Sequence, residues 1–386
     1  MTLSRTVYLD WAATSWPKPP CVGDAMVRAL STCGSPGRSG HSLSIEASRV
    51  LADARMAIAD FFEVPEPDHV AFTKNITEAL NVALLGLLRK GDHVVTTSIE
   101  HNSVMRPLRH LEKAGIHIHV VECTPDGRLS FDGLSELLKL RPRLVVATHA
   151  SNVLGTILPV RQIADLAHSH GSLVVLDAAQ TAGVLPVSMT EMGVDVLAFT
   201  GHKGLLGPTG TGGLCLSTLV EVEPLIRGGT GSASELETQP EFLPDALESG
   251  TPNVVGIAGL LAAVQYVDNT GAKAIREHEV RLGARIRDAL ASLPNVTQHG
   301  PVDPEDSIGV ISISIEGLLP SEVGLALEQV FGVQTRIGLH CAPAAHQTAG
   351  TYPVGTTRVS WGYFTTDEDI DVAIEGLTYL SAKARR

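Results

Sequence analysis

Short apolar runs rich in β-branched residues alternate with segments of helical spacing over about residues 46 to 200. The strand-like runs are residues 93–97, 116–121, 144–148, 173–176 and 194–199. Segments of helical length, such as residues 160–170, lie between them. Strands that are apolar along their whole length and alternate with helices are typical of a mostly parallel sheet covered on both faces. The sequence therefore predicts an α/β fold, in which ligands bind at the carboxyl ends of the strands.

The pattern changes after about residue 255. Two long helical segments, 256–269 and 272–293, precede the alternating run 308–315, which predicts a half-exposed antiparallel strand. We expect a large α/β domain at residues 16–255. A smaller α+β domain, formed by residues 1–15 and 256–386, is expected to carry the segment around Cys341.

Bulk composition argues against several classes of protein. The net charge of -13 disfavours a nucleic-acid partner, which would require a basic surface. The longest apolar stretch, residues 254–264, is too short to span a bilayer, and the first residues lack the apolar core of a signal peptide. The five cysteines are scattered without a C-x-x-C pair, so we expect no disulfide framework and no metal site. We expect a cytoplasmic protein without a membrane partner, and its basic end, residues 383–386, is interpreted as a solubilising tail.

Lys203 follows a strand-like run and precedes a glycine-rich stretch, residues 204–213. A lysine amine at a strand end can form a Schiff base with a carbonyl if its surroundings favour the neutral form. Three other motifs stand at strand ends, namely Asn75 to Glu78, Glu100 to Ser103 and Asp177 to Gln180. Each has an ordinary structural interpretation as a helix cap, with Asn75 and Glu78 matching a capping box.

Together the four motifs supply what pyridoxal phosphate requires. Lys203 offers an amine for the aldehyde, Asp177 a carboxylate for the ring nitrogen, and His101 a ring that can stack on the cofactor. The helix that begins after Asn75 offers unpaired N–H groups to a phosphate.

The order of these motifs resembles that of the class V, fold-type I pyridoxal-phosphate enzymes, and among them the SufS-like cysteine desulfurases and the selenocysteine lyases. The resemblance runs from Tyr8-Leu9-Asp10-Trp11-Ala12-Ala13-Thr14 to Thr366-Asp367-Glu368-Asp369. It implies a transferase fold with a seven-stranded, mostly parallel sheet, and pyridoxal 5'-phosphate as the cofactor. It also implies a homodimer that acts on L-cysteine or L-selenocysteine.

The same resemblance implies the roles of individual residues. The catalytic residues would be Lys203, Cys341 and His101. The cofactor contacts would be Lys203, Asp177, Gln180, His101, Asn152, Thr77, Ile76, Thr200, His202 and Thr251. Among these, Thr251 matches a residue that reaches the phosphate in the neighbouring subunit. The substrate contacts would be Arg358, Asn152, His41 and Ala13.

Cys341 separates this chain from a generic aminotransferase. It lies in Arg336-Ile337-Gly338-Leu339-His340-Cys341-Ala342-Pro343, where the neighbouring cations Arg336 and His340 would favour the thiolate. On the resemblance it is the nucleophile, and Arg358 is the clamp for the substrate carboxylate. The implied reaction has Lys203 take the Cα proton and Cys341 attack the substrate sulfur, which yields a persulfide and alanine.

The segment between Cys341 and Arg358 is short, as in the SufS-like group, so a sulfur-accepting protein or a small thiol is expected to come to the site. Residues 350–356 depart from the SufS-like pattern, and Ile337 and Leu339 replace more polar residues.

Other activities remain open at this stage. Selenocysteine lyase needs the same residues, whereas a C–S lyase or an aminotransferase would not need Cys341. The glycine run 207–213 suggests a dinucleotide-binding oxidoreductase but does not open a βαβ unit followed by an acidic residue. The fifteen histidines include no pair at zincin spacing, which disfavours a metal hydrolase. A non-catalytic scaffold would not need Lys203, Asp177, Cys341 and Arg358.

Overall fold

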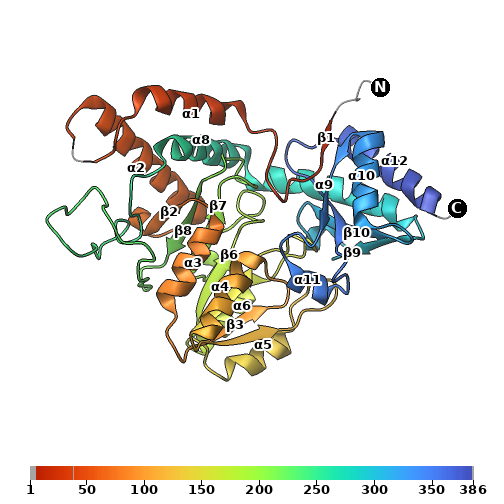
Figure 1. Ribbon diagram of the computed structural model, residues 1–386, viewed down its shortest axis with the longest axis horizontal. Helices are drawn as coiled ribbons and strands as arrows, with labels where there is room; N and C mark the ends of the chain where they lie inside the picture. Colours follow the sequence, from red (N-terminus) through yellow and green to blue (C-terminus); the bar gives the residue numbers. More distant parts are fainter. Residues whose placement is uncertain (1–5, 38, 385–386) are drawn as a thin grey trace.

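The computed structural model describes residues 6–37 and 39–384 (Figure 1). The first five residues of the expected small domain and the last two of the basic tail lie outside the described residues. No helix within the described ranges is long and apolar enough to cross a membrane. The cytoplasmic location stays a prediction.

A seven-stranded sheet forms the larger half of the molecule. Its strands, in spatial order, are β2 (Val70–Thr73), β8 (Gly212–Leu216), β7 (Val196–Thr200), β6 (Leu173–Asp177), β5 (Leu144–Thr148), β3 (His93–Thr97) and β4 (His117–Val121). β8 runs antiparallel to both of its neighbours, and all the other pairs are parallel. The predicted mostly parallel, seven-stranded sheet is therefore confirmed.

Helices cover both faces of this sheet, as the apolar strands require. Alternate side chains of each strand enter different clusters, so that Val95 packs on one face and Val94 on the other. The helices of this half are α1 (Pro20–Thr32), α2 (Ser42–Phe62), α3 (Ile76–Leu87), α4 (Asn102–Lys113), α5 (Phe131–Leu138), α6 (Val160–Ser169) and α7 (Met189–Met192), with the 3-10 turn η1 (Pro67–His69). α3 and α4 contribute to the cluster around Val94, and α2, α5 and α6 to the cluster around Val95.

A second, four-stranded antiparallel sheet lies beside the first (Figure 1). Its order is β12 (Arg336–Gly338), β13 (Thr356–Ser360), β10 (Val310–Ile315) and β9 (Val296–His299). Around it lie α9 (Ala272–Ala291), η2 (Pro304–Asp306), α10 (Pro320–Phe331), α11 (Pro343–Thr348) and α12 (Asp367–Ala384), together with the parallel pair β1 (Val7–Tyr8) and β11 (Val333–Gln334).

One local prediction was wrong, and one strand was missed. β10 is not half-exposed, because it lies between β9 and β13 and its Ser312 hydroxyl donates to the carbonyl of Val153 in the large half. β8, whose first two residues end the glycine-rich stretch 204–213, was not predicted as a strand. Gly213 pairs with β2 and β7 in this strand, and it must be glycine because a Cβ there would lie 2.5 Å from the Phe199 ring.

The proposed boundary at residues 255 and 256 falls inside α8 (Val254–Thr270), which packs against α1 and α2. The division into residues 16–255 against residues 1–15 and 256–386 stays a prediction.

Candidate active site

The parallel strands of the large sheet bring the predicted residues to one edge. β6 ends at Asp177, Lys203 follows β7 by three residues, and His101 lies between β3 and α4. Carboxyl ends of adjacent parallel strands meet at the same edge, which is why residues distant in sequence lie together here.

Asp177 is almost fully buried at this edge. One carboxylate oxygen accepts from the backbone N–H of Ala179 at 2.9 Å, and the other lies 3.5 Å from the hydroxyl of Ser103. Burial raises the pKa of Asp177, whereas the Ala179 N–H, Lys203 and Ser103 lower it. No helix follows, so Asp177 does not cap one. A buried carboxylate with one short bond and one long bond has room for a cationic partner.

Lys203 has the electrostatics that a reactive amine needs. Burial lowers its pKa to about 8, with Asp177 opposing this shift and Arg358 adding to it. A lysine with such a pKa is partly neutral at physiological pH, so its amine can act as a nucleophile and as a base.

His101 caps α4, as its structural interpretation predicted. Its Nδ1 accepts from the backbone N–H of Ser103 at 3.0 Å. Burial, with Lys203 and Arg358 nearby, lowers the pKa of His101 to about 4. The ring is therefore neutral at physiological pH. Because Nδ1 accepts from a backbone N–H, the ring proton lies on Nε2.

The start of α3 confirms half of the predicted capping box. Asn75 caps the helix by accepting from the N–H of Glu78 at 3.0 Å. The Glu78 carboxylate accepts from the N–H of Lys74 instead of that of Asn75. Ile76 is buried and Thr77 is exposed in the first turn, whose amides have no acceptor within the helix.

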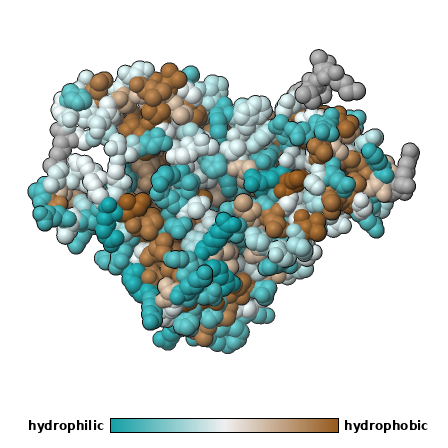
Figure 2. All heavy atoms as spheres, in the orientation of Figure 1, coloured by the Kyte–Doolittle hydropathy of each residue, from teal (hydrophilic) through white to brown (hydrophobic). Residues whose placement is uncertain are grey.

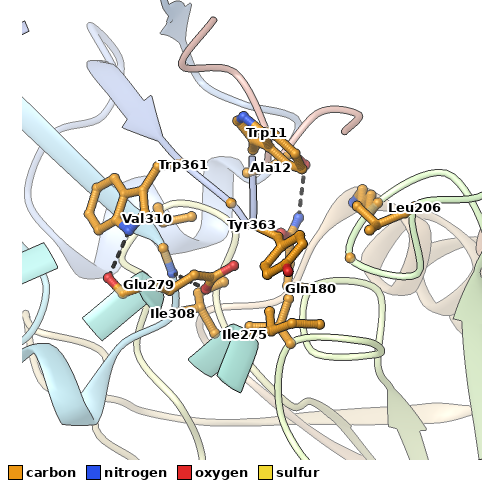
Figure 3. Close-up of a pocket in the computed structure, with 15 residues that line it drawn as sticks. Trp11, Ala12, Gln180, Leu206, Ile275, Glu279, Ile308, Val310, Trp361 and Tyr363 are labelled. Atoms are coloured by element: carbon orange, nitrogen blue, oxygen red, sulfur yellow. Dashed lines mark hydrogen bonds between the residues drawn. The ribbon is translucent and has the colours of Figure 1, made fainter. Parts of the chain in front are cut away.

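The remaining cofactor candidates at the edge are held by the N-terminal segment. Gln180 donates from Nε2 to the carbonyl of Ala12 at 3.0 Å, which places Ala13 next to this contact. The carbonyl of His202 accepts from Thr14 and from Lys18. Figure 3 shows the small cavity that Ala12 and Gln180 line together with Tyr363 and Glu279, and Lys203 also lines it.

Two buried ring or hydroxyl groups complete the edge. Thr200 is buried, and its hydroxyl donates to the carbonyl of Thr211 at 3.4 Å. The Nδ1 atom of His202 is buried without a hydrogen-bond partner within the described residues. Burial, with Lys203 and Lys18 nearby, lowers the pKa of His202 to about 4.

Glu100 was not predicted as a site residue, although it adjoins His101. It is fully buried, and its Oε1 accepts from the Thr97 hydroxyl at 2.7 Å and from the Thr148 N–H at 2.9 Å. Burial raises the pKa of Glu100 to about 8, and the Asp177 carboxylate contributes in the same direction. At neutral pH Glu100 is protonated. The signal in the sequence was a carboxylic acid immediately after an apolar run, in a motif where only the histidine drew attention.

Cys341 reaches this edge from the smaller half. The backbone N–H of Asn102 donates to the carbonyl of Cys341 at 2.9 Å, and Asn152 donates from Nδ2 to the carbonyl of His340 at 2.8 Å. The thiol side chain is exposed. Both His340 and Cys341 have positive φ values, 48° and 58°, so the chain turns sharply at the cysteine.

His340 is not the cation that the sequence suggested. It is buried, and burial together with Arg358 lowers its pKa to about 2. The imidazole is therefore neutral, and the prediction that it favours the thiolate of Cys341 by its charge was wrong.

Arg358 lies in β13 with its guanidinium buried. It donates from Nη2 to Asp10 at 2.7 Å and from Nη1 to the carbonyl of Asn152 at 3.0 Å. Its Nε is buried and has no hydrogen-bond partner within the described ranges. Asp10 was not predicted as a site residue, although a carboxylate in the N-terminal motif was a possible partner for a buried arginine.

Two predicted residues lie away from this group. His41 caps α2 by accepting from the N–H of Ser44 at 3.2 Å, at the turn between α1 and α2 in the upper left of Figure 1. Thr251 lines a different pocket, together with Thr73 and Lys74, beside the first turns of α3. The structure of one chain does not bring either residue to Lys203.

The arrangement fits pyridoxal phosphate. Asp177 is a buried carboxylate with a weak second partner, and Arg358 and His202 each keep a buried nitrogen without a partner. The free amides at the start of α3 and the amine of Lys203 meet the remaining needs of the cofactor. The fold and this edge are those of the fold-type I pyridoxal-phosphate enzymes.

Comparison with known proteins places the chain in the same class of enzymes. The profile of the aminotransferase class-V family matches residues 7–372, and this chain belongs to that family. A probable cysteine desulfurase of Methanothermobacter thermautotrophicus is 36% identical, over 96% of this chain and 94% of its own length. A cysteine desulfurase of Haloferax volcanii is 33% identical, over 96% of this chain and 88% of its own.

Solved structures give the same result. The apo structure of a cysteine desulfurase from Thermococcus onnurineus NA1 superposes with a TM-score of 0.92, at 31% identity, covering 98% of this chain and 95% of the other. A cysteine desulfurase from Escherichia coli gives 0.87 at 27% identity with the same coverage. The class V family implies pyridoxal phosphate as the cofactor.

Proposed function

We propose that this chain is a pyridoxal-phosphate-dependent cysteine desulfurase, which converts L-cysteine to L-alanine and carries the sulfur on Cys341 as a persulfide. The observation that carries the proposal is the hydrogen bond from the Asn102 amide to the Cys341 carbonyl. It ties an exposed thiol to the start of α4, directly after His101 and at the edge that holds Lys203 and Asp177. An aminotransferase or a C–S lyase has no use for a thiol placed there.

Pyridoxal phosphate, when bound, supplies an electron sink for the substrate's α-carbon. Asp177 would hold its ring nitrogen and the neutral His101 would lie against its ring. Gln180 and Asn152 would contact the ring hydroxyl. The phosphate would be held by Ile76, Thr77, Thr200 and His202 of this chain and Thr251 of a second chain.

The protein's own groups then divide the work. Arg358 binds the substrate carboxylate through its unpartnered Nε, while Asp10 keeps the guanidinium in place. Asn152 and Ala13 border the substrate. Lys203, whose pKa is about 8, takes the proton from the α-carbon and returns it.

Sulfur transfer is a displacement at the substrate sulfur. The thiolate of Cys341 forms a sulfur–sulfur bond while the carbon–sulfur bond of the substrate breaks. The electron pair of the broken bond stays with carbon, which takes up a proton as alanine forms. The products are alanine and one persulfide on Cys341.

A homodimer is part of the proposal because Thr251 and His41 have no role within their own chain's site. Apolar side chains on α1 and α2 favour contact with a second copy. Val27 and Leu30 are 65% and 70% exposed, and Figure 2 shows an apolar patch over α1.

The test is incubation of the cofactor-loaded protein with L-cysteine and, separately, with L-selenocysteine. Alanine is measured, and the persulfide on Cys341 is detected by mass spectrometry. We expect alanine and a persulfide from L-cysteine, and Cys341→Ala should lose the persulfide while keeping the visible absorbance of the cofactor. Alanine from L-selenocysteine alone would identify a selenocysteine lyase. A need for an amino-group acceptor would identify a transaminase.

A further inference from the structure

A groove of about 350 Å³ leads away from Cys341 between α3 and α4. At one end it is lined by Cys341 and by Thr77 and His101, which belong to the proposed cofactor site. One helical turn further along, it is lined by Asn81 of α3 and Arg106 of α4, and then by His110. The outer part of the groove has no role in the reaction proposed above.

The outer part carries a positive charge that no acidic group neutralises. None of the residues that line the groove is Asp or Glu. Arg106 makes no ion pair or side-chain hydrogen bond within the described residues. Its charge contributes to the lowered pKa of His101, although burial, Lys203 and Arg358 contribute more. Its neighbour Arg109, on the same helix, is held by two bonds to Glu112 at 2.9 and 3.0 Å. The unpaired cation, Arg106, therefore lines the groove that begins at Cys341.

We propose that this groove binds a small anionic sulfur acceptor, a thiol that carries a carboxylate or an inorganic sulfur anion such as sulfite, with Arg106 as its charge partner. Asn81 offers a hydrogen bond beside the cation. The inference rests on the proposed function, because it assumes that Cys341 carries a persulfide.

The transfer step is balanced without a further reactant. The acceptor's thiolate attacks the outer sulfur of the Cys341 persulfide, a new sulfur–sulfur bond forms, and Cys341 leaves as a thiolate. The acceptor departs as a persulfide, or as thiosulfate when the acceptor is sulfite. No electron donor is needed, because one sulfur–sulfur bond replaces another.

The experiment separates the two steps. The cofactor-loaded enzyme is first given a small excess of L-cysteine, and alanine and the Cys341 persulfide are quantified. Substrate is then removed by gel filtration. The loaded enzyme is mixed with 3-mercaptopropionate, with its neutral counterpart 3-mercapto-1-propanol, or with sulfite, and loss of the persulfide is followed with time.

We expect the anionic thiol to remove the sulfur about fivefold to tenfold faster than the neutral thiol at low salt, as one partly exposed charge pair allows. This preference should fall as sodium chloride rises from 0.05 to 0.5 M. Arg106→Gln should abolish the preference for the anionic thiol and slow the sulfite reaction by a similar factor. Alanine formation in the first step should be unchanged. Arg109→Gln, which removes a cation already paired to Glu112, should keep the preference.

The outcomes are distinct. Failure of the persulfide to form in the first step would overturn the proposed function. A persulfide that forms normally but passes to both thiols at equal rates would overturn the groove assignment alone. So would a preference that Arg106→Gln leaves intact, or that Arg109→Gln also removes. A preference for the anionic thiol without a response to sulfite would restrict the acceptor to thiols.

Discussion

The two regions that meet at the candidate site hold their reactive groups in different ways. At the edge of the large sheet, Asp177 and Lys203 occupy or closely follow the ends of buried parallel strands. The Cys341 segment is instead held by a few hydrogen bonds to its backbone carbonyls, such as those from the Asn102 amide and the Asn152 side chain, and it turns through residues with positive φ. The first region is fixed by the packing of the sheet, whereas the second is fixed by local backbone geometry.

This difference suits the chemistry of each region. Proton transfer at the cofactor requires groups that stay in place, and a strand end within a close-packed sheet provides this. The thiol must meet first the substrate and then an acceptor, so it is exposed at a turn. Changes at the edge should therefore remove the cofactor chemistry as a whole, and changes in the cysteine segment should spare the cofactor.

The largest effect is expected at the sheet edge. Lys203→Ala should abolish the visible absorbance of the linked cofactor and lower alanine production by a factor on the order of 10³ or more, because the amine is both attachment point and base. The matched control is Lys18→Ala. Lys18 also has its pKa lowered to about 8 by burial, but it donates to the carbonyl of His202. A visible band that survives Lys203→Ala, or disappears with Lys18→Ala, would contradict the assignment.

A change confined to the cysteine segment should separate the two regions. Gly355 has a φ of 80°, and a Cβ there would lie 2.3 Å from the carbonyl oxygen of Gly338, three residues before Cys341. Gly355→Ala should displace the thiol and slow alanine release about 10- to 100-fold, as misplaced catalytic groups do. The visible spectrum should be unchanged.

Gly350→Ala is the control for this variant. Gly350 has a φ of 71°, but a Cβ there would meet nothing within 4 Å. Gly350→Ala should strain the backbone without a collision, so it should lower the activity less than Gly355→Ala does. Equal losses would show that strain in the segment, rather than its contact with Gly338, decides the position of Cys341.

A smaller effect is expected at a residue pair in the smaller half of the molecule, where Asp10 lies beside β13. Asp10 orients Arg358 through a 2.7 Å bond. Asp10→Asn should raise KM for L-cysteine about tenfold with a smaller change in kcat, because a charge-assisted bond that orients the clamp is lost. Steady-state kinetics measures this split. A KM that falls would mean that Asp10 competes with the substrate carboxylate instead of supporting its binding.

The same contrast explains how much the sequence could predict. Residues at strand ends were found because an apolar run followed by a polar motif predicts both the strand and its reactive end, as at Asp177 and Lys203. β8 was missed because glycines such as Gly212 and Gly213 are rare in strands, and only pairing with β2 and β7 makes them one. The close approach to Phe199 then excludes a side chain there. Glycine there is a requirement of packing, which a single sequence does not reveal.

Ionisation states were the least predictable property. His340 was taken for a cation because it stands beside Cys341, yet its burial makes it neutral. Asp10 and Arg358 are 348 residues apart, and no local pattern joins them. Burial and pairing between residues far apart in sequence arise only when the chain has folded, so they follow from tertiary structure rather than from any motif.

The smallest effect is expected at the cavity beside Lys203, which residues of both halves of the molecule line. Glu279 of α9 lines this cavity, is buried, and accepts from the N–H of Gly309 at 3.2 Å (Figure 3). Burial raises its pKa from 4.5 to about 8. A carboxyl whose pKa is raised by folding contributes stability that is complete below the unfolded pKa, is lost as pH rises from about 4.5 to about 8, and changes no further above that.

Glu279→Gln removes this titration but keeps the size of the side chain. The melting temperature of the variant relative to the unaltered protein should therefore rise with pH between 5 and 8, by about 2–5 °C in all. Scanning calorimetry across that range measures the difference, and the visible spectrum should stay the same because Glu279 lies outside the cofactor contacts. A difference that is constant with pH would mean that Glu279 is ionised in the folded protein. The junction between the two regions would then hold a charged pair with Arg276 rather than a neutral acid.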